Sequence, residues 1–310
     1  MQRDMDETRG RITKDGIRIY EDADFAGMRA AGQVSAGILD RVAALVVPGV
    51  TTAALDRFIT DEIARLGVTS ATIGYKGYRH ASCISVNHVV CHGIPGEPIP
   101  KGGGETISKN LEKRRADDRL LDGDILNIDV TVIADGWFGD NSRMYVAGTL
   151  SPRSERLIQV TYDAVMKGIE AVRPGNTFGD IGQAIQAYVE DNRMSVVRDF
   201  CGHGLGRVFH APPNVLHYAP FYLNAEGQKV DKIGRRVEDR TPVLEEGMFF
   251  TIEPMVNLGR PETRVLADDW TAVTRDKSLS AQFEHSVGVT ATGAEIFTAS
   301  PAGKFHPTWG

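Results

Sequence analysis

The feature of this sequence that most restricts its fold is an internal repeat. Val47-Pro48-Gly49-Val50-Thr51 is similar to Arg173-Pro174-Gly175-Asn176-Thr177, and apolar residues at helical spacing follow both segments. Each segment predicts a Pro-Gly turn, a threonine that caps a helix, and then an amphipathic helix. A chain that repeats such a unit is expected to fold into two similar halves.

A second repeated segment carries acidic residues. Residues 120–132 (LLDGDILNIDVTV) are similar to residues 244–256 (LEEGMFFTIEPMV), and the alignment places Asp129 on Glu253. Both segments predict a β-strand, because they are rich in β-branched and apolar residues. Each predicted strand therefore carries one carboxylate inside an apolar run.

A third pair and a histidine complete the repeat. Asp140-Asn141-Ser142 matches Glu284-His285-Ser286, and each half carries a His-Gly pair, at residues 92–93 and 203–204. The expected order in each half is helix, histidine segment, carboxylate strand, second carboxylate strand. The alternative is two generic α+β segments with coincidental glycines. Three pairs in the same order favour a duplication whose carboxylates meet in a central cleft between the halves.

The four carboxylates indicate a metal site. An ionised carboxylate in an apolar strand is costly unless it is paired or binds a metal. A salt bridge to a distant Arg or Lys is the ordinary explanation for one such residue, but converging like charges need a cation. Four carboxylates and one imidazole suit Mn, Fe, Co or Zn and can hold two ions. The candidate ligands are Asp129, Asp140, His203, Glu253 and Glu284.

Two histidines lie in one glycine-rich segment, His203 and His210. Glycine lets the backbone approach a ligand closely, which favours a functional role for both. Cys201 and His203 could suggest zinc, but no second Cys/His pair supports a closed structural site, so Cys201 is interpreted as a packing residue. His92 occupies the equivalent segment of the first half. Surface or supporting positions are expected for His80, His88, His217, His285 and His306.

Composition and charge limit the partners and the cellular location that we expect for this protein. The net charge of −6 gives no general reason to expect nucleic-acid binding, and three cysteines argue against a disulfide scaffold. The N-terminus lacks the apolar segment of a signal peptide, and no apolar run is long enough for a membrane span. We therefore expect a cytoplasmic protein that does not enter a membrane. Two polar, charged stretches, 100–119 and 224–240, predict surface loops or inserted hairpins.

The motifs around these residues resemble those of the methionine aminopeptidases of the bacterial type I class. The resemblance runs from about residue 17 to residue 297, and each candidate ligand has its own flanking motif. The matching segments are 83–87 (CISVN), 89–95 (VVCHGIP), 123–130 (GDILNIDV), 139–140 (GD), 201–204 (CGHG), 209–210 (FH), 250–256 (FTIEPMV) and 282–285 (QFEH).

The resemblance implies the α+β "pita-bread" fold, with two pseudo-symmetric halves around a dinuclear metal site. It implies that Asp129 holds one ion, that His203 and Glu253 hold the other, and that Asp140 and Glu284 bridge both. It also implies removal of the initiator methionine from nascent polypeptides with a small second residue, by attack of a metal-activated water.

The resemblance assigns further roles by position. Glu253 takes and shuttles the proton, His210 stabilises the tetrahedral intermediate, and His92 contacts the scissile amide nitrogen. One Na or K ion is implied near Asn87, Val89 and Ser280. The residues implied to bind the methionine are Tyr75, Tyr78, Cys83, His92, Phe209, His210 and Trp270.

Spacing and length set the subclass and the layout. Glu253 and Glu284 are 31 positions apart, too close for the helical insertion of type II enzymes. Ala211-Pro212 and Phe200 depart from the residues usual in the family, without removing a ligand. The expected layout is a tail at 1–16, one catalytic domain at 17–300 with halves at about 36–150 and 160–297, and a tail at 301–310.

Two rival functions remain. A proline-specific dipeptidase or aminopeptidase P shares this fold but usually carries a further N-terminal domain, whereas about 35 residues precede the first repeated helix here. A catalytically dead binding protein would have lost ligands, and all five positions are present. The expected partners are nascent peptide N-termini. The basic residues of both insertions could also contact the ribosome transiently, but solvated hairpins without a partner are the favoured interpretation, because acidic residues offset much of this charge. A monomer is expected.

Overall fold

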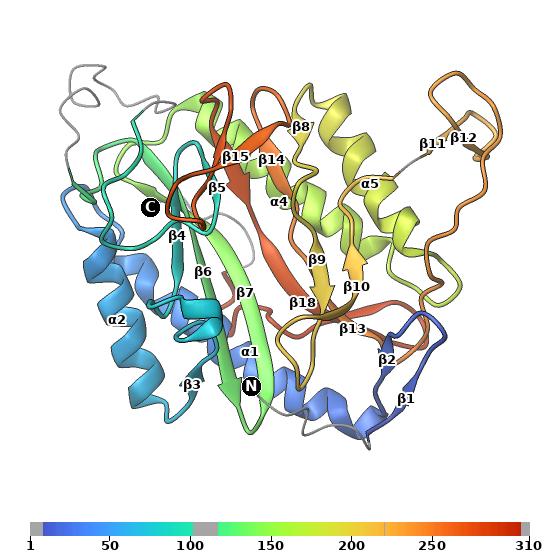
Figure 1. The fold of residues 1–310 in the computed structure, drawn as a ribbon, viewed down its shortest axis with the longest axis horizontal. Helices are drawn as coiled ribbons and strands as arrows, with labels where there is room; N and C mark the ends of the chain where they lie inside the picture. Colours follow the sequence, from blue (N-terminus) through green and yellow to red (C-terminus); the bar gives the residue numbers. More distant parts are fainter. Residues whose placement is uncertain (1–8, 102–116, 220, 305–310) are drawn as a thin grey trace.

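The computed structural model describes residues 9–101, 117–219 and 221–304 (Figure 1). The helices are α1 (Asp22–Val42), η1 (Ala43–Leu45), α2 (Thr52–Arg65), η2 (Tyr75–Gly77), α4 (Pro152–Glu170) and α5 (Phe178–Asp191). The strands are β1 (Arg11–Ile12), β2 (Arg18–Ile19), β3 (Thr69–Ser70), β4 (Cys83–Val86), β5 (Val89–Cys91), β6 (Asp124–Ala134), β7 (Trp137–Ala147), β8 (Ser195–Val196), β9 (Gly202–Gly204), β10 (Ala211–Val215), β11 (Tyr222–Leu223), β12 (Lys229–Val230), β13 (Phe249–Ile252), β14 (Met255–Asn257), β15 (Thr263–Val265), β16 (Ala272–Thr274), β17 (Ser280–Gln282), β18 (Glu284–Val289) and β19 (Ala294–Ile296).

One large sheet joins the two halves. Its strands run in the order β10-β9-β13-β18-β7-β6-β3, with β4 added to β6 and β19 to β18. Helix α1 packs on β6 and β7, and α4 packs on α5 and on the strands of the second half (Figure 1). Each half has its own apolar core, one around α1, α2 and β6 and one around α4, α5 and β13. The central pair β7–β18 is the junction between the halves, as expected for a pita-bread architecture.

The repeated helices begin as the sequence predicts. Thr51 accepts a hydrogen bond from the backbone N–H of Ala54 at 3.2 Å and caps α2. Thr177 accepts one from the backbone N–H of Asp180 at 3.2 Å and caps α5. Both caps satisfy a donor that the first helical turn leaves free.

The same backbone contact anchors each Pro-Gly turn to its carboxylate strand. The N–H of Gly49 donates to the carbonyl of Leu120 at 2.8 Å, and the N–H of Gly175 donates to the carbonyl of Leu244 at 3.1 Å. These four residues occupy matching positions in the two repeated segments. The predicted duplication of the helix and the first strand is therefore present in three dimensions.

The second carboxylate strands also correspond, and their hydrogen bonds give the register. Gly123 donates to the carbonyl of Ala147 at 2.8 Å, and Gly247 donates to the carbonyl of Val289 at 2.9 Å. Ala147 is therefore the equivalent of Val289. The pairing of β6 with β7 and of β13 with β18 continues each hairpin from these points without a shift.

This register corrects one detail of the expected repeat. Seven residues before Ala147 is Asp140, and seven residues before Val289 is Gln282 rather than Glu284. Glu284 instead corresponds to Ser142. The sequence match placed Asp140 on Glu284 and was wrong by two residues. Because side chains alternate along a strand, a shift of two keeps the carboxylate on the same face of the sheet.

The two hairpins differ in continuity. β6 and β7 pair along eleven residues each, whereas the second hairpin is interrupted at Glu253-Pro254 on one strand and at Phe283 on the other. Proline has no N–H to donate to a sheet, which explains a break at Pro254. Glu253 therefore lies between β13 and β14, outside regular strand geometry.

The N-terminal segment differs from the expected tail. Residues 9–19 form the β1–β2 hairpin, in which Arg11 pairs with Ile19 and Ile12 with Arg18. Ion pairs fasten the hairpin to the body, from Arg9 to Asp24 and from Arg11 to Glu245. The tail thus contributes a structured element. The short pattern of apolar and polar residues at 11–19 did not predict it.

The second insertion is a hairpin on the surface, as expected. β11 and β12 pair within it, and Lys229 ties it to α5 through Asp180 and to Asp239, at 2.7 and 2.8 Å. In Figure 1 it projects at the upper right, away from the central strands. Residues 102–116 of the first insertion lie outside the described residues.

Candidate active site

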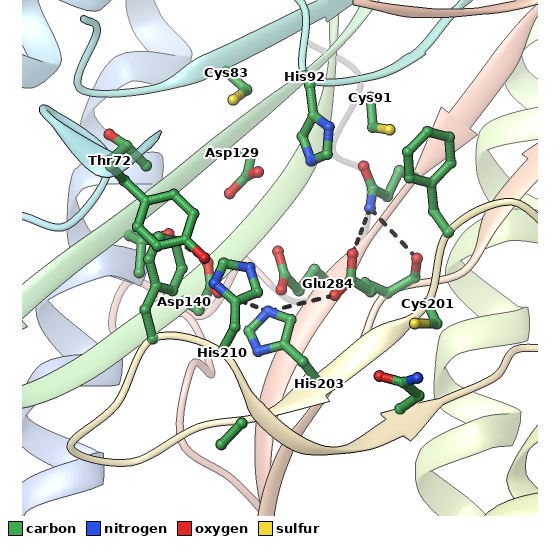
Figure 2. A pocket seen from close by; sticks show the side chains of 18 of the residues that line it. Thr72, Cys83, Cys91, His92, Asp129, Asp140, Cys201, His203, His210 and Glu284 are labelled. Atoms are coloured by element: carbon green, nitrogen blue, oxygen red, sulfur yellow. Dashed lines mark hydrogen bonds and ion pairs between the residues drawn. The ribbon is translucent and has the colours of Figure 1, made fainter. Parts of the chain in front are cut away.

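A cavity of about 680 Å³ opens where the two halves meet (Figure 2). Its lining includes every residue that the sequence suggested as a divalent-metal ligand, an auxiliary histidine or a methionine-binding group. These residues are Asp129, Asp140, His203, Glu253, Glu284, His92, His210, Tyr75, Tyr78, Cys83, Phe209 and Trp270. The structure thus brings together residues that are up to 209 positions apart in the chain.

His203 lies in β9 between two glycines. A Cβ at Gly202 would lie 2.4 Å from the carbonyl oxygen of Thr251, and a Cβ at Gly204 would lie 2.2 Å from that of Pro212. Only glycine allows β9 to lie this close to both neighbours. The imidazole Nε2 lies 3.4 Å from Asp140 Oδ2, across the junction of the halves.

Asp140 and Glu284 form a cluster with His203. One ligand atom from each of the three lies within 4.8 Å of the other two. Both carboxylates are buried, and the Thr131 hydroxyl donates to Asp140 Oδ1 at 2.6 Å. Burial, followed by the charge of Asp140 and other carboxylates, raises the pKa of Glu284 well above its usual value. Such a group is hard to ionise without a cation.

Asp129 carries a buried carboxylate oxygen, Oδ1, without a hydrogen-bond partner among the described residues. It lies opposite Cys83 on β4 and Ser142 on β7. Burial first, and then the charges of Asp140 and Glu253, raise the pKa of Asp129 well above its usual value. A buried oxygen without a partner, facing other carboxylates, is what a metal ligand presents when its ion is removed. The donor set therefore fits divalent cations.

Glu253 is held by polar groups of the second half. The Thr251 hydroxyl donates to Oε1 at 2.9 Å, and the Gln282 side-chain amide donates to Oε2 at 3.2 Å. Burial raises the pKa of Glu253 to about 7, against the opposing effect of His203. The backbone N–H of Glu253 donates to Nε2 of the fully buried His217 at 3.1 Å.

Sequence reasoning did not assign Thr251 and Gln282, and it expected for His217 only a surface or supporting position. Thr251 and Gln282 each stand two positions before a candidate ligand, and the alternation of a strand places such residues on the ligand's face. The sequence therefore contained a signal from which Thr251 and Gln282 could have been identified. His217 gives no comparable signal, because its contact with Glu253 depends on how β10 and β13 are placed in space.

His210 and His92 line the same cavity as the carboxylates (Figure 2). His210 stacks on Tyr75 with ring centroids 5.1 Å apart, and burial together with His203 lowers its pKa to about 4. Burial also lowers the pKa of His92, which contacts Phe200 and Trp270 edge-on. Both imidazoles are therefore neutral near pH 7, and each can donate one N–H and accept one hydrogen bond.

Aromatic rings and a thiol form the wall beside Asp129. The rings of Tyr78 and Trp270 lie 4.9 Å apart, and those of Tyr75 and Phe209 also lie 4.9 Å apart. Burial raises the pKa of the Cys83 thiol above its usual value, so it remains uncharged. This wall is apolar and polarisable, which suits a thioether side chain.

The residues implied to bind a monovalent ion lie beyond this cavity. The backbone N–H of Ser280 donates to the carbonyl of Asn87 at 2.9 Å. Ser280 stands opposite Asn257 in the pairing of β14 with β17, and Ser280 Oγ and Asn257 Oδ1 are buried without a hydrogen-bond partner in the described structure. Val89, in β5, is buried next to Asn87 and His88.

The buried carboxylates and imidazole beneath a cavity of this size define a metal-dependent hydrolase. The family model of metallopeptidase family M24 matches residues 26–291. The chain is 48% identical to the methionine aminopeptidase of Rickettsia prowazekii, over 94% of this chain and 99% of that protein. It is 43% identical to the methionine aminopeptidase of Escherichia coli K12, over 91% of this chain and 94% of the relative. The chain belongs to metallopeptidase family M24.

Solved structures agree with this placement. The Rickettsia prowazekii methionine aminopeptidase superposes with a TM-score of 0.77, covering 91% of this chain and 99% of that one. The Thermotoga maritima methionine aminopeptidase has 33% identity and a TM-score of 0.76 over 91% of this chain and 99% of that one. A prolidase from Pyrococcus horikoshii shares the fold alone, at 15% identity and a TM-score of 0.62, with 90% and 63% of the two chains covered.

Proposed function

We propose that this chain removes the N-terminal methionine from nascent polypeptides whose second residue is small. The observation that carries the proposal is the cavity itself, which has a carboxylate and imidazole floor and an aromatic, thiol-bearing wall. The relatives named methionine aminopeptidase, which match nearly their whole length, support the same activity.

The donor set supports two divalent ions of the Mn, Fe, Co or Zn type. Asp129 would hold one ion, His203 and Glu253 would hold the other, and Asp140 and Glu284 would contribute to both. Ligand atoms of Asp140, His203 and Glu284 lie within 4.8 Å of one another, and Asp129 carries an unbonded buried oxygen; both observations support a metal site that includes these residues. When bound, such a pair of ions lowers the pKa of water and so supplies a nucleophile at neutral pH.

The chain's own residues then handle protons and orientation. Glu253 has a pKa of about 7, so its carboxylate can take a proton on Oε and release it again near neutral pH. Neutral His210 donates a ring N–H to the carbonyl oxygen as negative charge develops there. Neutral His92 contacts the nitrogen of the scissile amide. Tyr78, Cys83 and Trp270 enclose the methionine side chain.

Peptide hydrolysis tests the assignment directly. Metal-free protein receives Mn, Fe(II), Co or Zn under anaerobic conditions, and release of methionine from Met-Ala-Ser is measured. Met-Leu-Ser should react far more slowly, because a bulky second residue does not fit near the floor. Equal rates on both peptides would contradict the proposed specificity.

The rival functions give different outcomes in the same assay. Cleavage of Xaa-Pro peptides without cleavage of Met-Ala-Ser would indicate a proline-specific peptidase. Hydrolysis of neither peptide with any metal would indicate a binding protein. The presence of all five ligand positions in one cavity supports a catalyst over the latter.

A Na or K ion near Asn87, Val89 and Ser280 is a separate proposal. The buried, unbonded oxygens of Ser280 and Asn257 support it, because an oxygen-lined position of this kind suits a hard cation. Thermal unfolding in Na, K and a bulky organic cation tests it. Equal melting temperatures in all three would contradict it.

The setting of the activity follows from its substrate. Nascent chains are made in the cytoplasm, and there we place the protein; every residue of the proposed site comes from one chain, which supports a monomer. Within the part of the chain that the structure describes, no helix has the length and hydrophobicity to cross a bilayer.

Ribosome contact has limited support. The basic residues at 113–115 lie outside the described residues. In the second insertion Arg235 pairs with Asp231 at 2.7 Å, which offsets its charge. No residue of 221–240 lines the cavity. Co-sedimentation with ribosomes at low and moderate salt, with Arg235 and Arg236 changed to Glu, tests the remaining possibility of contact. Unchanged sedimentation would contradict it.

A further inference from the structure

The N-terminal hairpin forms part of the wall at the mouth of the cavity. Asp15 lies in the turn between β1 and β2, and it lines the cavity together with Pro212, Pro213 and Asn214 of β10. The neighbouring Gly16 is close to β10 as well, since a Cβ built there would lie 3.8 Å from Pro212 Cγ. The first structured residues of the chain thus reach the site that the two halves form.

The position of the turn is well defined by hydrogen bonds. Thr13 donates its N–H to the carbonyl of Ile17 at 2.9 Å, and Gly16 donates to the carbonyl of Thr13 at 3.0 Å. At the end of the hairpin, the N–H of Tyr20 donates to the carbonyl of Gly247 at 2.8 Å, next to β13. The carboxylate of Asp15 is therefore carried by an element fixed to the second half.

Exposure orders the cavity from floor to mouth. Tyr78, Cys83 and the proposed metal-binding carboxylates are largely buried, whereas Pro212 and Asp15 are exposed. In the proposed function the methionine occupies the buried end, so the following residues of the peptide must leave past the exposed end. Asp15 then faces the side chains two or three positions after the methionine.

The charge of Asp15 is available to such a side chain. Asp15 forms no ion pair with any residue that the structure describes. Apart from the proposed metal ligands and the histidines, the charged residues in the described part of the chain that line the cavity are Asp15 and Lys76. Lys76 is engaged elsewhere, because its Nζ lies 5.2 Å from the centre of the Tyr75 ring and its charge acts on His210.

We propose that Asp15 is a specificity-determining residue that favours peptides with Lys or Arg at the third or fourth position and disfavours Glu or Asp there. The inference rests on the proposed function, because that function sets the direction in which the peptide lies. An exposed ion pair is weak and screened by salt, so the expected preference is modest and falls with ionic strength.

Matched peptides measure this preference. Met-Ala-Lys-Ser, Met-Ala-Gln-Ser and Met-Ala-Glu-Ser, and the series with the variable residue at position four, are used as amides so that the chain end adds no charge. We measure kcat/KM for wild type, Asp15→Asn, Asp15→Lys and Asp61→Asn, each in about 20 mM and about 500 mM salt. The two salt concentrations are chosen because the screening length differs several-fold between them. Asp61 is an exposed aspartate on α2, outside the cavity. Asp61→Asn therefore removes the same charge as Asp15→Asn, but away from the proposed peptide path.

In at least one series, wild type should prefer the Lys peptide to the Glu peptide by about three- to tenfold at low salt, and by less at high salt. Asp15→Asn should bring the ratio towards one, Asp15→Lys should invert it, and Asp61→Asn should keep the wild-type ratio. A ratio that Asp15→Asn leaves unchanged, or that Asp61→Asn changes equally, would overturn the inference while the peptidase activity stands. Failure to hydrolyse any of these peptides would overturn the proposed function and the inference with it.

Discussion

The two halves begin alike and end differently. Each has a capped helix and a Pro-Gly turn bonded to its carboxylate strand in the same way. In the first half the hairpin is continuous and Asp129 has an unbonded buried oxygen. In the second half the hairpin is interrupted at Glu253, and Thr251, Gln282 and His217 contact that residue.

The difference shows how a repeated scaffold supplies two unlike sets of candidate metal ligands. A continuous strand has its backbone groups committed to neighbours, so Asp129 receives only what nearby side chains offer. The interruption frees the Glu253 backbone N–H and places the carboxylate beside two donors. The pKa of Asp129 is accordingly raised well above its usual value, while that of Glu253 is about 7. We infer that Asp129 depends on the metal for its charge more than Glu253 does.

The largest expected effect comes from residues that bind metal. Glu253→Ala and Asp140→Ala should each lower kcat/KM on Met-Ala-Ser by at least ~10³-fold, through lost metal as well as lost proton transfer. Metal analysis and circular dichroism accompany the assay, to separate lost metal from lost fold. Activity within tenfold of wild type in a folded Glu253→Ala protein would remove Glu253 from the proposed mechanism.

His210→Ala should have a smaller effect of a different kind. The metal content should stay at the wild-type level, because this side chain is not a proposed ligand, while kcat falls by ~10²-fold if it stabilises developing charge. The measurement is kcat alongside metal analysis of the same preparation. An unchanged kcat would show that the assigned role is wrong.

Asp129→Asn should stabilise the metal-free protein at high pH. A carboxyl with a raised folded pKa binds more protons in the folded state, so its contribution to stability falls as pH rises above the unfolded pKa. The Asn side chain does not ionise, so the variant avoids this loss of stability at high pH. We expect a higher free energy of unfolding than wild type at pH 8, and little difference near pH 4.

Denaturant unfolding of EDTA-treated protein at both pH values provides the measurement. Asp61→Asn, on the exposed face of α2, is the matched control and should show no pH-dependent gain. A metal-free Asp129→Asn protein less stable than wild type at pH 8 would contradict the comparison of the halves.

The smallest expected effect concerns the supports of Glu253. Thr251→Val removes the hydroxyl that donates to the carboxylate, so the pKa of Glu253 should rise above 7 in the metal-free protein. Carboxyl-selective NMR titration measures the change. Thr131→Val, which removes the donor to Asp140 in the first half, is the matched variant and should move the pKa of Glu253 less. An equal shift in both variants would show that the support is not local.

Much of this site could be predicted because repeats and motifs are local signals. The Pro-Gly turns, the threonine caps and the apolar strands around Asp129 and Glu253 are visible in the sequence, and all are present in the structure. Their convergence followed from the repeat, since two similar units joined edge to edge bring equivalent residues together.

The remaining features of the site depend on strand register and on contacts between distant segments, which local sequence patterns do not specify. In the repeat, Glu284 corresponds to Ser142 rather than to Asp140, its apparent match in the sequence. The hydrogen bonds of β6 with β7 and of β13 with β18 determine this correspondence, whereas the sequence match relied on residue likeness. The contact of His217 with Glu253 and the place of Asp15 at the mouth both join distant segments. A short hairpin such as β1–β2 gives little pattern, and its own ion pairs to the body hold it in place.

The number of metal ions bound per chain tests the central claim most directly. Equilibrium dialysis against Mn²⁺ under anaerobic conditions, followed by metal analysis, is applied to wild type, Asp129→Asn and His203→Ala. We expect two ions at saturation for wild type, and loss or marked weakening of one ion in each variant, because the halves supply different positions. Two ions bound with unchanged affinity in both variants, or none bound by folded wild type, would contradict the account.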